Sequence, residues 1–247
     1  MTMRMTKTSP QLRTGLRRFN SVLPAPTDAI NQVQPTLRGL YAITPDQAST
    51  SLLVAMVQAA VTGGAALVQY RNKLAPKPLR REQIAALLPI CHAACAKLIV
   101  NDDLDLAIEL DADGLHVGRD DAGGSLALVR QALGPNRLLG VSCYNDLSLA
   151  KNAAASGASY LAFGSMFASS TKPAAVKASL ALLGEARRFG LPVAAIGGIT
   201  LANAPSVIAA GADLLAVITD LFTAEDIQLQ AKKYASFFTQ PVGATPS

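Results

Sequence analysis

Eight short apolar segments recur between residues 37 and 220, and most are separated by stretches with hydrophobic residues at helical spacing. Most of the segments are almost continuously apolar, as expected for parallel strands covered on both faces. We predict strands over Leu37–Thr44, Ala66–Arg71, Lys97–Asp102, Gly114–Gly118, Leu138–Cys143, Tyr160–Met166, Val193–Ile199 and Leu214–Asp220.

The intervening stretches suit helices, and several of them end at glycine, which commonly terminates a helix. The spacing predicts helices over Leu52–Val61, Leu79–Ala96, Ser125–Leu133, Leu147–Ala155, Ser179–Phe189, Ala202–Ala210 and Ala224–Phe238.

A shorter signature joins a helix to each even-numbered strand. Glycine tolerates the left-handed turn that ends a helix, and a small residue after it lets the strand pack closely. The four copies begin at Gly64, Asp113, Gly157 and Gly211. Strand–helix units with this alternation predict an α/β fold, a single (β/α)₈ TIM barrel. A doubly wound open sheet competes, but no G-x-G-x-x-G motif follows the first strand.

The barrel is expected over residues 37–240, after a basic and flexible N-terminal extension, residues 1–36, and before a C-terminal tail, residues 241–247. The extension has five basic residues and one acidic residue, so it carries +4 of the net charge of +5. The rest of the chain is therefore near neutral, which argues against nucleic acid as a partner. No apolar stretch is long enough to span a bilayer, so no membrane partner is expected.

Three cysteines, an odd and sparse count, do not form a disulfide framework and fit a reducing, cytoplasmic location. Cys91 and Cys95 lie one helical turn apart among alanines, so we interpret them as core residues rather than zinc ligands. The sequence leaves open whether the chain forms a homo-oligomer.

Polar groups of one chemical kind lie at the ends of the predicted strands. Gln69, Arg71 and Lys73 run out of the second strand, where alternate residues share a face. Arginine offers a planar fork for phosphate oxygens and lysine a compact charge. A solvated basic loop is the alternative, but Gln69 and Arg71 adjoin an apolar strand, which favours anion binding.

Carboxylates at two neighbouring strand ends predict a magnesium site. Asn101 and Asp102 close the third strand, and Asp121 follows the fourth, although physics alone does not separate it from Asp120. Mg²⁺ prefers one or two carboxylates together with substrate phosphates and water. Two further carboxylates, Asp103 and Asp105, are interpreted as charges at a helix start.

Later strand ends add a second group of anion-binding candidates. Ser142 closes the fifth strand, hydroxyls and an ammonium follow the sixth at Ser169, Ser170, Thr171 and Lys172, and Gly197-Gly198 follows the seventh. With Ile218-Thr219 on the eighth strand, the glycine pair fits the phosphate site of many barrels. His116 is the one histidine within a predicted strand; we interpret it as a barrel-interior residue, with acid–base catalysis as the alternative. Together these residues predict a metal-dependent enzyme that joins a diphosphate-activated group to a phosphorylated acceptor.

Six short motifs resemble those of the thiamine-phosphate synthase family over roughly residues 37 to 227. They are Gln69-x-Arg71-x-Lys73, Asn101-Asp102, Gly114-Leu115-His116-Val117-Gly118 with Asp121, Gly140-Val141-Ser142, Thr171-Lys172, and Ile196-Gly197-Gly198-Ile199. The resemblance implies coupling of a hydroxymethylpyrimidine diphosphate to a thiazole phosphate, with loss of diphosphate and no protein nucleophile.

The resemblance also implies a role for each matching residue. Asp102 and Asp121 would hold Mg²⁺, while Arg71, Lys73, Lys172 and Ser142 would act on the leaving diphosphate. The remaining substrate contacts would come from Gln69 and Asn101 on the pyrimidine side, and from Ser169, Ser170, Thr171, Gly198, Ile218 and Thr219 on the thiazole-phosphate side.

The chain departs from the family pattern in the loop Gly164–Lys172, where two prolines and one threonine are replaced. Arg119 replaces a frequent glutamine, and Thr219 a common serine. Two alternatives therefore stay open. One is a thiazole tautomerase-like protein, which typically carries a histidine where Tyr144 stands, and the other is a non-catalytic thiazole-phosphate-binding regulator of the same fold.

Overall fold

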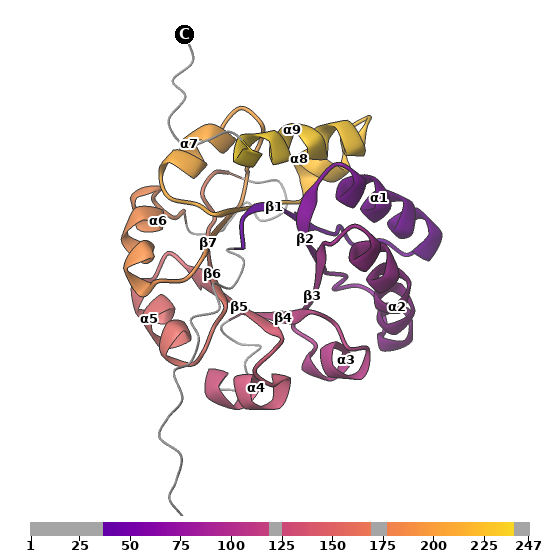
Figure 1. Ribbon diagram of the computed structural model, residues 1–247, viewed down its shortest axis with the longest axis horizontal. Coiled ribbons are helices and arrows are strands. Elements are labelled where there is room, and N and C mark those ends of the chain that lie inside the picture. The colour runs from indigo at the N-terminus through magenta and orange to yellow at the C-terminus, as the bar shows by residue number, and fades with distance from the viewer. Residues whose placement is uncertain (1–36, 119–124, 169–176, 240–247) are drawn as a thin grey trace, which may run out of the picture. The chain divides into compact units, whose positions relative to one another are not determined.

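The strands close into one parallel barrel in chain order, so that β1 pairs with both β2 and β8 (Figure 1). The computed structural model describes residues 37–118, 125–168 and 177–239. The strands are β1 (Gly39–Ile43), β2 (Ala65–Tyr70), β3 (Lys97–Asn101), β4 (Gly114–Val117), β5 (Leu138–Tyr144), β6 (Tyr160–Phe163), β7 (Val193–Ile196) and β8 (Leu214–Val217). This confirms the predicted (β/α)₈ barrel and all eight predicted strands, with shifted ends.

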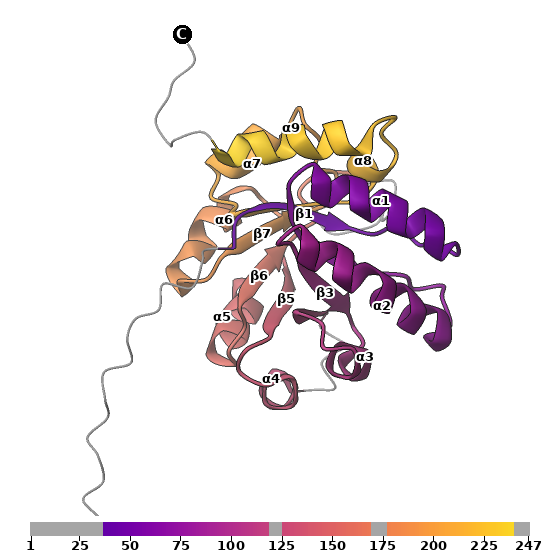
Figure 2. The same cartoon turned by 45° about the vertical axis from the view of Figure 1, so that its right-hand side comes forward.

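Helices surround the barrel on its outer side, as the turned view also shows (Figure 2). They are α1 (Thr50–Thr62), α2 (Lys77–Ala93), α3 (Leu104–Glu109), α4 (Leu126–Leu133), α5 (Leu147–Ala155), α6 (Ala181–Ala186) continued by the 3₁₀ turn η1 (Arg187–Phe189), α7 (Ala204–Ala209), α8 (Thr219–Phe222) and α9 (Ile227–Thr239). The seven expected helices are present. None of the described helices is both long and apolar enough to cross a bilayer.

Two short helices, α3 and α8, are present in addition to the seven that the sequence predicted. The eighth strand ends at Val217 rather than Asp220, because the chain turns into α8 at Thr219. Most of the other helices end at a glycine, but α3 does not. Asp111 adopts the left-handed backbone at its end (φ 53°). The signature that we placed at Asp113 is therefore shifted by two residues, and Asp111 corresponds to Gly64, Gly157 and Gly211.

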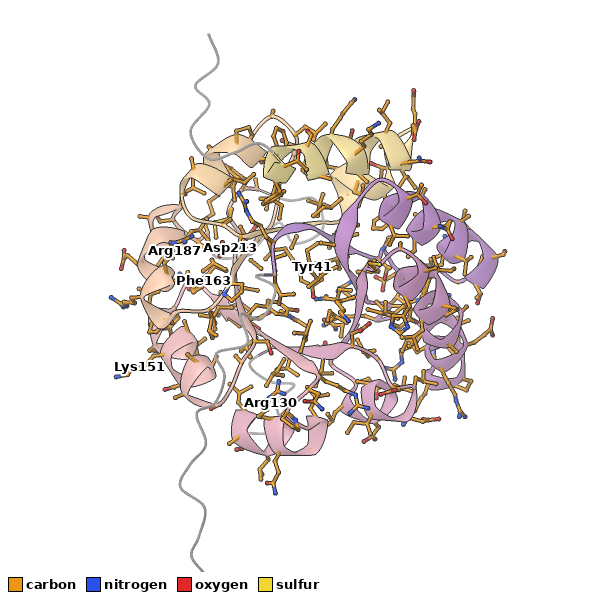
Figure 3. All side chains as sticks on the ribbon, viewed as in Figure 1. Tyr41, Arg130, Lys151, Phe163, Arg187 and Asp213 are labelled. Atoms are coloured by element: carbon orange, nitrogen blue, oxygen red, sulfur yellow. The ribbon has the colours of Figure 1, made fainter. Side chains whose placement is uncertain are left out.

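Apolar residues fill two regions, which explains the continuously apolar strands. One set of strand side chains, with Leu67 and Ile99 among its members, meets inside the barrel, where Figure 3 labels Tyr41. The other set packs between the strands and the helices. The sixth and seventh predicted strands were too long because Met166 and Ile199 are buried in loops. Burial rather than strand pairing keeps those positions apolar.

The N-terminal ends of the strands are held by one repeated contact. Asp113, Ser159 and Asp213 each precede an even-numbered strand. Their side-chain oxygens accept the backbone N–H of Leu98, Leu139 and Val193, respectively, at 2.9, 3.0 and 2.9 Å. Each contact ties an even strand to the preceding odd one, at the end of the barrel away from the βα loops.

Replacing Asp113 by alanine should lower the free energy of unfolding by about 2 kcal/mol, because the Leu98 N–H loses its acceptor. Urea unfolding at neutral pH measures the change. Glu225→Ala, at an exposed position, is the control and should stay within about 0.5 kcal/mol of the parent protein. Equal stabilities of the parent and the Asp113 variant would contradict the prediction.

The difference between the parent and the Asp113 variant should shrink in acid. Burial alone would raise the pKa of the Asp113 carboxyl, but the Leu98 N–H, Lys97 and His92 hold that pKa below its usual value. A lowered pKa in the folded state stabilises fully above the unfolded value of about 4, and this contribution is lost as pH falls through the folded pKa. A pH series of urea midpoints checks the sign.

Candidate active site

The segment Gln69–Lys73 leaves β2 at the C-terminal end of the barrel, where a TIM barrel carries its active site. It is fastened to the loop after β1. The buried Thr44 hydroxyl accepts the Arg71 N–H and donates to the Arg71 carbonyl, both at 2.9 Å. The Asp46 carboxylate accepts the Lys73 N–H at 2.6 Å and lies 3.5 Å from the Arg71 guanidinium. Arg71 is therefore fixed through both its backbone and its side chain.

The alternate residues of the same segment anchor it on the other side. The Tyr70 hydroxyl and the Asn72 amide both donate to Gln83 of α2, at 2.8 and 3.0 Å, and Asn72 also donates to the Gln47 carbonyl. Both side chains are buried. Tyr70 and Asn72 therefore point toward α2 and stabilise the segment. Gln69 and Arg71 lie on the opposite face, as the period-two argument predicted.

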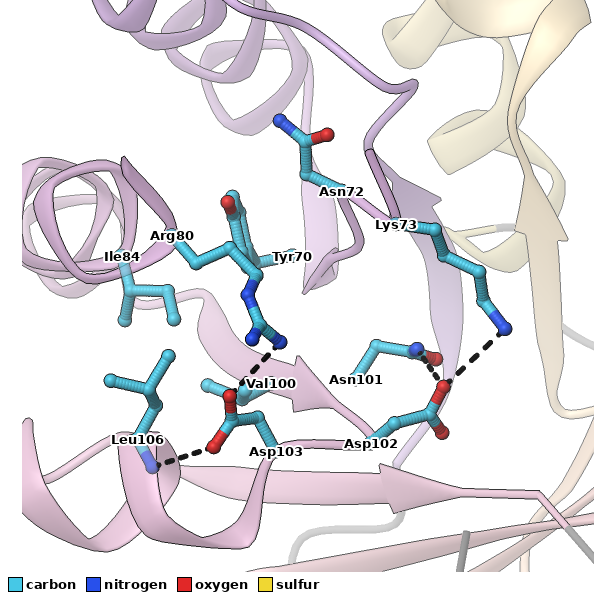
Figure 4. A pocket seen from close by; sticks show the side chains of 10 residues that line it. All are labelled: Tyr70, Asn72, Lys73, Arg80, Ile84, Val100, Asn101, Asp102, Asp103 and Leu106. Carbon is cyan, nitrogen blue, oxygen red and sulfur yellow. Dashed lines mark hydrogen bonds and ion pairs between the residues drawn. The ribbon is translucent and has the colours of Figure 1, made fainter. Parts of the chain in front are cut away.

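The end of β3 brings a carboxylate to this cationic segment. The Lys73 ammonium lies 3.5 Å from the Asp102 carboxylate, which also accepts the Asn101 side-chain N–H at 2.5 Å (Figure 4). Asp102 follows the strand with left-handed backbone (φ 61°), and its N–H donates to the His116 carbonyl at 2.9 Å. Unusual backbone of this kind is concentrated at functional sites.

Asp103 turns away from Asp102. It caps α3 by accepting the Leu106 N–H at 3.1 Å, and it pairs with Arg80 at 2.9 Å (Figure 4). Asp105 is exposed on the first turn of α3. Both interpretations of these carboxylates as helix-start charges are confirmed. A cavity of about 200 Å³ opens between Lys73 and the ion pair of Asp103 with Arg80. Tyr70, Asn72 and Asn101 also line it.

His116 and Ser142 join the site from inside the barrel. The two His116 ring nitrogens lie 3.0 Å from the Tyr160 hydroxyl and 2.9 Å from the Ser142 hydroxyl. The Gln69 amide donates to Tyr41 at 2.7 Å, and Tyr41 lies 2.6 Å from Tyr160. Burial lowers the pKa of His116 to about 4, so the ring is neutral at neutral pH. The interpretation as a hydrogen-bonded interior histidine is confirmed.

The loops after β7 and β8 supply the second group. Gly197 and Gly198 have positive φ (99° and 62°), and a Cβ on Gly198 would overlap the Ala168 carbonyl. Ile218 precedes α8 and Thr219 begins it, rather than both lying on a strand. Two side chains support these loops: Asn203 donates to the Gly198 carbonyl at 2.9 Å, and Tyr234 of α9 donates to Asp220 at 2.6 Å.

Several predicted site residues lie outside the described residues: Asp121, Ser169, Ser170, Thr171 and Lys172. Within the described part of the chain, no group of three or more His, Cys, Asp and Glu side chains could hold a metal ion. Asp102 offers a single carboxylate beside Lys73. A donor set of one or two carboxylates suits Mg²⁺, which takes its other ligands from substrate phosphates and water.

Sequence reasoning missed the residues that support the site. Thr44 and Asp46 fix Arg71 and Lys73, and the polar residues at the end of the first predicted strand were the signal that could have identified them. Tyr41 and Tyr160 gave no such signal, because a tyrosine inside an apolar strand is indistinguishable from core.

The family is decided by similarity across most of the chain. A family model described as thiamine monophosphate synthase matches residues 40–221. The chain belongs to the thiamine monophosphate synthase family. As a member of this family it is an enzyme, a transferase of thiamine biosynthesis.

Named relatives agree over nearly their whole length. The thiamine-phosphate synthases of Methylobacillus flagellatus and Azoarcus sp. are 52% and 53% identical, covering 83% and 82% of this chain and 97% and 98% of theirs. The solved thiamine phosphate pyrophosphorylase from Pyrococcus furiosus is 31% identical with a TM-score of 0.72, covering 81% of this chain and 95% of that one. A 3-hexulose-6-phosphate synthase structure, 20% identical with a TM-score of 0.57, covers 79% of this chain and 98% of its own, and shares the fold alone.

Thr44→Val should release the backbone of Arg71, because a methyl group replaces the hydroxyl that pairs with both its N–H and its carbonyl. We expect the Arg71 amide to exchange its hydrogen at least about tenfold faster, which corresponds to losing roughly 1.4 kcal/mol of protection. Thr44→Ser keeps the hydroxyl and is the matched control. Equal protection of Arg71 in the two variants would contradict this role of Thr44.

Proposed function

We propose that the chain couples 4-amino-2-methyl-5-(diphosphooxymethyl)pyrimidine to 4-methyl-5-(2-phosphoethyl)thiazole and releases diphosphate. The observation that carries the proposal is the contact between Lys73 and Asp102 beside the doubly anchored Arg71. Two cations and one carboxylate at the C-terminal end of the barrel suit a diphosphate bound with a divalent ion. Family membership supports the choice of substrates.

The chemistry proposed is a dissociative substitution. The bond between the pyrimidine methylene carbon and the diphosphate oxygen breaks, and its electron pair leaves with the diphosphate. The electron-rich aminopyrimidine spreads the positive charge of the resulting carbon, and the thiazole nitrogen then donates its lone pair to form the new C–N bond. No proton has to be removed, so the mechanism requires no general base.

The residues of this chain serve mainly to stabilise the leaving group. Arg71 and Lys73, with Lys172, place positive charge where negative charge develops as the C–O bond breaks. Asp102 and Asp121 would hold Mg²⁺, which supplies further neutralisation of the diphosphate when bound. Gln69 and Asn101 would orient the pyrimidine, and Ser142 would contact the diphosphate.

The acceptor is proposed to bind at the loops after β7 and β8. Gly198 and the backbone of Ile218 and Thr219 would hold its phosphate, because glycine lets the main chain approach closely. Ser169, Ser170 and Thr171 would line the rest of the pocket. The anchors Asn203 and Tyr234 keep the two loops in place.

Small molecules are thus the proposed partners, with a cytoplasmic location and neither nucleic acid nor membrane involved. Cys91 is buried, as expected, whereas Cys95 is exposed, so the interpretation of Cys95 as a core residue is wrong. The odd and sparse cysteine count supports a reducing compartment.

Purified protein with Mg²⁺ and both substrates should form thiamine phosphate and diphosphate in equal amounts. Chromatography of both products measures these amounts. Thiazole tautomerisation without coupling would instead support the tautomerase-like alternative. Binding of the thiazole phosphate with no turnover would support the regulator.

Asp102→Ala should lower kcat at least about a hundredfold, on the scale of losing a main electrostatic contribution to a transition state. Initial rates at saturating substrates measure the change over a range of Mg²⁺ concentrations. Asp105→Ala removes a neighbouring carboxylate that is exposed on α3 and should retain the parent rate. An unchanged rate for the Asp102 variant would exclude this residue from the metal site.

A further inference from the structure

Five polar side chains cross the barrel interior in one hydrogen-bonded chain. It runs from Gln69 through Tyr41, Tyr160 and His116 to Ser142, with successive distances of 2.7, 2.6, 3.0 and 2.9 Å. Tyr41 and Tyr160 pack within the apolar interior cluster, and their exposed fractions are 1% and 0%. The residues at the two ends of this hydrogen-bonded chain, Gln69 and Ser142, are ones that we propose to contact substrate. The three middle residues lie beneath them in the barrel.

Counting protons along this chain gives it a direction. The Gln69 side-chain N–H donates to Tyr41, so among the described residues the Tyr41 proton has only the Tyr160 oxygen as acceptor. The Tyr160 proton then has only His116 Nδ1. Nδ1 is therefore unprotonated, and the neutral ring carries its hydrogen on Nε2, which donates to the Ser142 oxygen.

Burial keeps both tyrosines in the protonation state that this count assumes. It raises the pKa of both tyrosines well above the usual value, so each hydroxyl carries one proton. Because Nδ1 accepts the Tyr160 proton, the His116 ring carries its hydrogen on Nε2 beside the Ser142 oxygen. A neutral imidazole needs one donor and one acceptor as partners, and Tyr160 and Ser142 supply them.

We infer that His116, Tyr160 and Tyr41 are positioning residues that occupy the Ser142 oxygen and leave its proton free to donate to an anion at the barrel mouth. The assignment of that anion as the substrate diphosphate rests on the proposed function. With the opposite direction, Ser142 would donate to His116 and present only an acceptor lone pair, which repels a phosphate oxygen.

Gly140 provides the space for this arrangement. It lies two residues before Ser142 on β5, and a Cβ there would overlap the Tyr160 ring and come within 2.6 Å of His116 Nδ1. The close approach of the β5 backbone explains why glycine occupies this interior position.

The ring tautomer of His116 tests the direction without any substrate. The chain has two histidines, so ¹⁵N-labelled histidine gives two ring patterns, and His92→Gln, at an exposed site, assigns them. We expect His116 to show an unprotonated Nδ1 and a protonated Nε2 at neutral pH. A protonated Nδ1 would overturn the inference, whether or not the protein makes thiamine phosphate.

A double-mutant cycle tests the effect on Ser142. Tyr160→Phe removes one hydroxyl from the chain and should lower kcat/KM for the diphosphate substrate about three- to tenfold, a typical loss for one hydrogen bond. In a Ser142→Ala background the same change should lower kcat/KM by less than about twofold, because the Ser142 proton that Tyr160 helps to orient is absent. An equal loss in both backgrounds would mean that Tyr160 acts only on the barrel structure, and would overturn the inference. If the parent protein makes no thiamine phosphate, the same four proteins are compared by the dissociation constant of inorganic diphosphate with Mg²⁺ in place of kcat/KM. Failure of the proposed function is then distinguished from failure of this inference.

Discussion

Closure of the barrel is the constraint on which the site depends. Because β1 pairs with β8 as well as β2, the C-terminal ends of strands far apart in sequence share one rim. The rim side chains can then be fixed by neighbouring strands rather than by their own. Arg71, at the end of β2, is held by Thr44 and Asp46 from the end of β1. Lys73 reaches Asp102 at the end of β3.

The contacts around Arg71 and Lys73 give charge without much flexibility. Exposed ion pairs contribute little to stability, since two long side chains must be ordered in water. Here the backbone hydrogen bonds from Thr44 and Asp46 do the ordering, while the ammonium and guanidinium remain at the rim. Electrostatic stabilisation is most effective when the charges are in place before the reaction, because reorganisation then costs little.

The barrel interior combines two roles that usually conflict. Apolar side chains fill most of it, and tyrosine, histidine and amide groups among them bond to one another. A buried polar group is costly when unpaired, and a fully paired network is rigid. The same five side chains that satisfy one another in the interior therefore also connect Gln69 and Ser142, two residues on different strands that we propose to bind substrate.

The sequence by itself determined the architecture and the chemical character of the rim. Apolar segments at regular spacing require burial on both faces, and the groups at their ends had to meet once the barrel closed. Tertiary structure alone decided which of those groups meet at the rim and which support neighbouring elements. Asp102 and Asp103 are adjacent in sequence, yet one faces Lys73 and the other caps α3. Tyr41 and Tyr160 are 119 residues apart, and their contact arises only because closure brings the interior faces of β1 and β6 together, which no local pattern encodes.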